Sequence, residues 1–108
     1  MHKRLLAAVV LGVSACVLAA EDAEAPFLKE NEAAMVKMMA AMAVTPSGDV
    51  DKDFVATMVP HHQGAIEMAQ AELRYGHNEQ LRRIAQEIIV DQTQEIAVMR
   101  LAIGAPAK

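Results

Sequence analysis

Three stretches with helical apolar spacing constrain the fold more than any other feature of this chain. In residues 26–43, 52–75 and 79–103, apolar side chains recur at intervals of three and four, which places them on one face of an α-helix. The composition agrees, because the 108 residues are rich in Ala, Met, Glu and Gln and only 3% are aromatic. The sequence therefore predicts one all-α domain with a thin core.

Short connections fix how the three helices follow one another. Residues 44–49, VTPSGD, contain the proline and glycine of a loop, and Asp49 or Asp51 is expected to cap the next helix. The second connection, residues 76–78, is so short that the helices on either side of it must lie antiparallel, and Asn78 is expected to cap the third helix. We therefore predict an up-down-up antiparallel helical bundle over residues 26–104, followed by a tail of residues 105–108.

Pro60 lies inside the second stretch and leaves two interpretations open. Proline removes one backbone hydrogen bond and crowds the preceding turn. Residues 52–75 are then either one bent helix or two helices with a break before Pro60. Of the two, we favour one bent helix.

Residues 1–20, MHKRLLAAVVLGVSACVLAA, have the basic start and apolar run of a secretory signal helix. Cleavage after Ala19 or Ala20 fits this pattern. Two alternatives are a lipoprotein signal, in which Cys16 becomes the lipidated first residue, and an uncleaved anchor. All three predict a periplasmic or secreted domain that meets a membrane only through its signal or lipid anchor.

Residues 21–25, EDAEA, are expected to form a short disordered lead.

The only cysteine is Cys16, so the mature domain has no disulfide and no thiolate ligand. Without Lys3 and Arg4 the chain keeps 8 basic and 14 acidic side chains, and this net charge of −6 argues against nucleic-acid binding. The mature chain has one serine, Ser47, and no phosphate-binding glycine loop, so we predict that it is not an enzyme.

Two adjacent histidines mark the second stretch. His61 and His62 lie three and four residues after Met58, and Met68 follows two turns beyond His61 on the edge of the same helical face. Adjacent helical residues are rotated by about 100° from each other, so the two rings cannot easily share one ion. Each is expected to pair with methionines, or one binds an ion while the other makes a hydrogen bond.

Methionines on the other two helices extend this set of donors. A methionine stripe alone is more often core packing than a metal site, but the histidine pair beside it favours a metal. Thioether and imidazole donors without thiolate favour copper, above all Cu(I), whereas zinc prefers Cys, His and carboxylate. The candidate metal ligands are Met35, Met38, Met39, Met42, Met58, His61, His62, Met68 and Met99.

Two polar side chains lie near the apolar face of the third stretch, Gln92 and Glu95. Buried polar groups need partners, so we expect one of these side chains to orient a histidine from outside the ligand set. The alternative is a solvent-exposed position for both. A di-iron site is disfavoured, because no Glu in the chain has a His three residues later.

The residues from Asp53 to Ala69, DFVATMVPHHQGAIEMA, resemble the signature of domain-of-unknown-function family 305 (DUF305), which includes CopM-like copper-binding proteins. The residues from Leu81 to Leu101 are similar to the second half of the same pattern. This resemblance covers roughly residues 30–103. It implies a ferritin-like helical bundle that is exported, with copper binding through Met and His in some members.

These observations together predict an exported copper-binding protein. It would sequester or carry Cu(I) or Cu(II), contribute to copper tolerance, and exchange the metal ion with copper transport or efflux proteins. The alternative is a structural or adaptor helical bundle without a metal role, in which a homodimer buries the methionine face.

Overall fold

The computed structural model describes residues 11–108, and these form three helices: α1 (Leu11–Met42), α2 (Val50–Tyr75) and α3 (Glu79–Ala102). No strand occurs in this part of the chain. The prediction of an all-α fold with three main helices is therefore confirmed. Half of the expected signal helix, residues 1–10, lies outside the described residues. No helix within residues 11–108 is long and apolar enough to cross a membrane.

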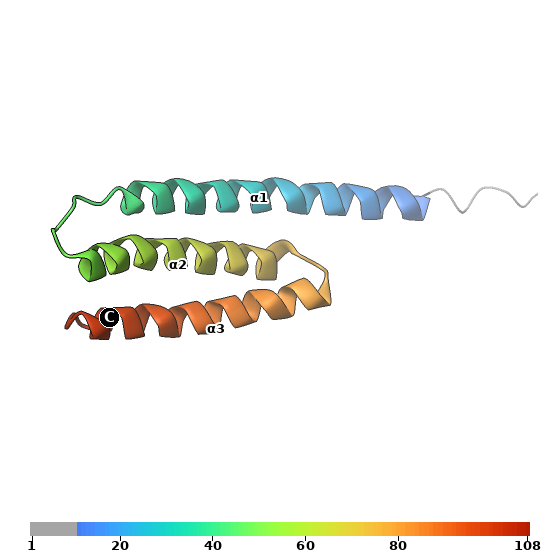
Figure 1. The fold of residues 1–108 in the computed structure, drawn as a ribbon. Coiled ribbons are helices and arrows are strands. Elements are labelled where there is room, and N and C mark those ends of the chain that lie inside the picture. The colour runs from blue at the N-terminus through green and yellow to red at the C-terminus, as the bar shows by residue number, and fades with distance from the viewer. Residues whose placement is uncertain (1–10) are drawn as a thin grey trace, which may run out of the picture.

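The helices form an up-down-up bundle that stays open on its sides. In Figure 1, α2 lies between α1 and α3, and neighbouring helices run antiparallel. Both outer helices pack on α2, and over their described residues no Cα atom of α1 lies within 8 Å of a Cα atom of α3. The result is a layer one helix thick, in which each outer helix has a single neighbour.

Side-chain caps begin the second and third helices. The Asp49 carboxylate accepts hydrogen bonds from the backbone N–H groups of Asp51 and Lys52, at 2.9 and 3.3 Å. Asn78 accepts from the N–H of Leu81 at 3.0 Å. Each cap satisfies donors that the first turn of a helix leaves free. The cap that we expected at Asn78 is confirmed, and of the two candidates for α2 the structure selects Asp49.

Both helical prolines lie inside continuous helices. α2 passes through Pro60 without a break, which confirms the one-helix interpretation. α1 differs from the sequence prediction, because it runs through residues 21–25 and places Pro26 in its interior. A disordered lead was expected there. Ala and Glu are strong helix formers, and in this segment they outweigh the single hydrogen bond that Pro26 removes.

The core of the described residues is small. None of their large side chains is fully buried. Val55, Val59 and Ile96 form a cluster at the contact between α2 and α3, and Met99 packs against it. Helices that bury so little leave much of their apolar faces on the surface.

α1 and α2 approach closely at Gly64. A Cβ atom added at Gly64 would lie 2.6 Å from the Met38 sulfur and 3.0 Å from the Met38 Cβ. Distances this short cannot be relieved by moving the sulfur alone, because the Met38 Cβ is fixed to the backbone of α1. The absence of a side chain at Gly64 therefore lets Met38 pack directly on α2.

We expect Gly64→Ala to lower the free energy of unfolding. The helix-propensity gain of about 1 kcal/mol opposes an overpacking cost of about 1–3 kcal/mol, so the net loss is roughly 1 kcal/mol. Urea denaturation measures it. As a matched control, the double variant Met38→Ala with Gly64→Ala should lose less free energy of unfolding than the two single variants lose in total. If the double variant loses as much free energy of unfolding as the two single variants together, the Met38 side chain does not interact with position 64.

Candidate metal site

His62 is the buried polar side chain that joins α2 to α3. It is 9% exposed, and its Nε2 lies 2.6 Å from Oε2 of Glu95 on α3. An ionised carboxylate can only accept, so the imidazole Nε2–H donates this hydrogen bond. Of the two polar side chains that we expected to contact a histidine, the structure brings Glu95 to His62.

Two buried polar atoms, one on α2 and one on α3, lack a hydrogen-bond partner within the described residues. They are Nδ1 of His62 and Oε1 of Gln92, which precedes Glu95 by one turn of α3. With Nε2–H donating to Glu95, Nδ1 of the neutral ring carries a lone pair. A buried polar atom without a partner is costly, so each of these atoms needs a water molecule, an ion or another ligand to satisfy it. A histidine that donates one ring N–H to a carboxylate is also the usual form of a metal-bound histidine.

The two histidines have different surroundings. His61 is exposed, whereas His62 faces α3. The ring centroids are 6.1 Å apart and the ring planes meet at 61°. This edge-to-face arrangement follows from the rotation between adjacent helical residues. Of the two histidines, His62 makes the hydrogen bond, to Glu95, and which of them binds an ion stays a prediction.

The candidate methionines lie on all three helices and differ in exposure. On α1, Met38 and Met42 are half-buried, while Met35 and Met39 are 46% and 62% exposed. The remaining three are half-buried, Met58 and Met68 on α2 and Met99 on α3. Met58 is one turn before His62, and Met99 is one turn after Glu95, so these two lie nearest in sequence to the histidine contact.

No three His, Cys, Asp or Glu side chains within the described residues come together in a way that could hold a metal ion. A closed structural zinc site usually needs four such ligands. The atoms left without a partner are one imidazole nitrogen of His62 and the amide oxygen of Gln92, and the methionines nearest to His62 and Glu95 along the sequence are Met58 and Met99. A soft ion that accepts nitrogen and sulfur fits this set better than zinc does.

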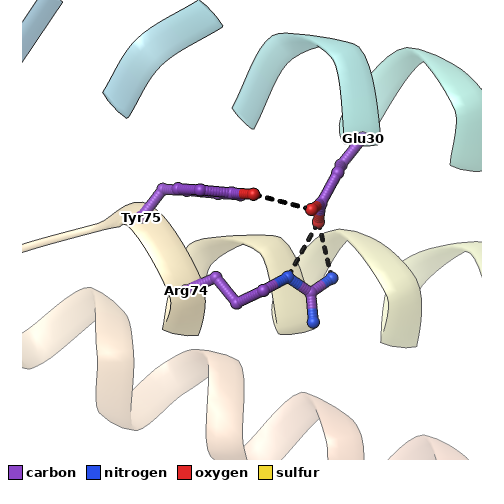
Figure 2. Close-up of polar contacts among 3 residues, drawn as sticks. All are labelled: Glu30, Arg74 and Tyr75. Atoms are coloured by element: carbon purple, nitrogen blue, oxygen red, sulfur yellow. Dashed lines mark hydrogen bonds and ion pairs between the residues drawn. The ribbon is translucent and has the colours of Figure 1, made fainter. Parts of the chain in front are cut away.

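A polar cluster between α1 and the last turn of α2 was not predicted from the sequence. Figure 2 shows Arg74 and Tyr75 converging on Glu30. Arg74 donates through Nε and Nη2 to Glu30 Oε2 at 2.9 and 2.5 Å, and the Tyr75 hydroxyl donates to Oε1 at 2.8 Å. The Arg74 hydrogen bond holds the pKa of Glu30 below its ordinary value, and the bond to Glu30 raises the pKa of Tyr75. The partners are 44 and 45 residues apart, a separation that no helical periodicity reveals.

The Glu30 cluster makes the stability of the α1–α2 contact depend on pH. The pKa of Glu30 is lowered from 4.5 in the folded chain, so folding favours its charged form. This contribution is complete above pH 4.5 and is lost as the pH falls through the lowered folded value. We expect urea midpoints to fall less on acidification from pH 6 to pH 3 in Glu30→Gln than in the wild type. Glu32→Gln, an exposed position on the same helix, should behave like the wild type. Equal losses in all three proteins would contradict this account.

Comparison with known proteins gives one family match. The family described as Domain of unknown function (DUF305) matches residues 17–103, which include all of α2 and α3. No curated protein matches the chain. The match does not separate CopM-like copper-binding members from the rest of the family, and it assigns no ligand to any residue.

Proposed function

We propose that this chain, which belongs to the DUF305 family of unknown function, binds copper through His and Met side chains and sequesters or carries Cu(I) or Cu(II). The observation that supports this function is the buried, unpartnered Nδ1 of His62. Its other ring nitrogen is held by Glu95 at 2.6 Å, so the lone pair on Nδ1 has a fixed direction.

The side chains around His62 supply the remaining donors. Met58, one turn away on α2, and Met99, one turn beyond Glu95 on α3, are the thioethers nearest to this contact along the sequence. Thioethers need no deprotonation, and together with imidazole they favour Cu(I). Copper bound there would gain nitrogen and sulfur ligands. Glu95 orients the ring, and the Val55, Val59 and Ile96 cluster shields one side of the contact from water.

The methionines of α1 have a secondary place in this proposal. His62 faces α3, whereas α1 packs on α2 from its other side. Met35 and Met39 therefore belong to a separate face of the chain and are not proposed as ligands of His62. The signal-like pattern of residues 1–20 supports export to a periplasm, where copper transport or efflux proteins would exchange the ion with the chain.

Anaerobic titration of the metal-free protein with Cu(I), in competition with a chromophoric chelator, tests this function. We expect the wild type to withdraw copper from the chelator. His77→Ala, in the exposed turn between α2 and α3, should bind as the wild type does. Binding no tighter than that of a weak chelator would refute the proposal.

A further inference from the structure

One side of the three-helix layer carries apolar side chains from all three helices. We call this side the open face and define it by Leu28, Met35, Met39, Met68, Leu81 and Ile84. Leu28, Met35 and Met39 line a hollow along α1, while Met68, Leu81 and Ile84 line a groove of about 350 Å³ that α1, α2 and α3 share. Helical spacing adds Phe54 and His61 to this side of α2, because both share a stripe with Ala65 and Met68.

The open face is large enough for a protein interface. Six of its apolar side chains, Leu28, Met35, Met39, Phe54, Leu81 and Ile84, are between 46% and 62% exposed. At roughly 200 Å² for a large side chain, they present about 600 Å² of apolar surface. The half-buried Met58, Met68 and Ile88 bring this close to the roughly 800 Å² per partner of a standard interface.

The polar side chains that join the helices lie elsewhere. Glu67 and Arg74 occupy the side of α2 opposite to Ala65 by helical spacing, and they pair with Lys37 and Glu30 of α1. On the open face, Glu32 and Glu72 lie among the lining residues. The interhelical ion pairs of Lys37 and Arg74 therefore lie on one side of the layer, and the hollow and groove lined by apolar side chains lie on the other.

We propose that a second copy of this chain covers the open face, so that two three-helix layers pack face to face around a two-fold axis. A stable domain buries its apolar faces between two layers, and the described residues supply only one. A second copy supplies a layer of equal width, equal length and the same apolar chemistry, as a self-complementary two-fold contact requires. The methionines at this face have flexible side chains that adapt to such packing.

The middle helix lies at the centre of this dimer. Ala65 is the small residue at the midpoint of the open face of α2, and it lets the two α2 helices approach closely. His61 precedes Ala65 by four residues and Met68 follows it by three. An antiparallel pairing about Ala65 thus brings His61 of one copy toward Met68 of the partner subunit. This pairing completes a second His–Met site, a consequence that rests on the proposed copper function.

Sedimentation velocity of the metal-free protein at roughly 100 µM tests the dimer. The wild type should have twice the mass of one chain. Ile84→Glu, on the open face, should weaken self-association at least ~100-fold, because it buries an unpaired charge. Val90→Glu is the matched control: it lies on the opposite side of α3, and Val90 is 54% exposed against 49% for Ile84. It should stay dimeric.

Met39→Glu on α1 gives a second disrupting variant, and circular dichroism shows whether each variant keeps its helices. A monomeric wild type, or equal effects of Ile84→Glu and Val90→Glu in helical proteins, would overturn the dimer. The copper titration is independent of this result. A dimer that binds no copper refutes the proposed function alone, and a copper-binding monomer refutes the dimer alone.

Discussion

Replacing His62 by alanine is expected to lower the Cu(I) affinity by at least ~100-fold. The change removes the buried nitrogen that has no partner in the metal-free chain. Removing a group that only orients a metal-bound histidine typically costs about 10- to 100-fold, so loss of the ligand itself should exceed that range. The anaerobic chelator competition measures the loss of affinity, both for a variant that lacks the ligand and for one that lacks the group orienting it.

The orienting role of Glu95 has its own expected result in the same assay. Glu95→Ala should reduce the affinity by about 10- to 100-fold, because the His62 ring loses the contact at 2.6 Å that fixes its tautomer. Glu87→Ala is the control, since Glu87 is exposed on the same helix. If Glu95→Ala and Glu87→Ala bind copper equally well, the carboxylate has no part in the site.

The second large effect concerns stability in the absence of copper. His62→Leu should raise the free energy of unfolding of the metal-free protein by about 1–2 kcal/mol, because it removes a buried polar atom without a partner. Glu95 is left with its side chain 60% exposed, so the loss of its partner costs little. Each kcal/mol corresponds to roughly 4–8 °C in the melting temperature of a domain this size.

This gain in stability must coincide with a loss of copper binding. A ligand that has no partner in the metal-free chain is kept at a cost to stability, and this is the recurrent trade-off at functional sites. The matched control is His61→Leu, which changes an exposed ring and should alter stability far less. A destabilised His62→Leu would indicate that His62 is a satisfied structural residue.

The helices were predictable because their signals are local. The apolar spacing, the cap at Asn78 and the short turn after Tyr75 each act within a few residues, and the structure has all three where they were predicted. The continuous path of α1 through residues 21–25 was not predicted, because EDAEA is acidic enough to suggest disorder and yet has high helix propensity.

The arrangement of the candidate site was predictable only in part. Helical geometry separates His61 from His62, but their sequence does not say which one faces α3. That choice depends on the rotation of α2 against its neighbours, which Gly64 and Met38 help to set through a contact 26 residues apart in sequence. The apolar spacing likewise identifies the apolar face of each helix but does not say what covers that face. The same spacing is therefore expected for a closed bundle and for an open layer.

The atom at which copper binds tests the central claim most directly. Cu(I) is diamagnetic, so long-range ¹H–¹⁵N correlation spectra of the ¹⁵N-labelled protein can follow both ring nitrogens of His62 during titration. We predict that Nε2 stays protonated through its bond to Glu95 and that the Nδ1 resonance moves as copper is added. Ring nitrogens of His62 that do not change at copper saturation, or coordination through Nε2, would contradict the account.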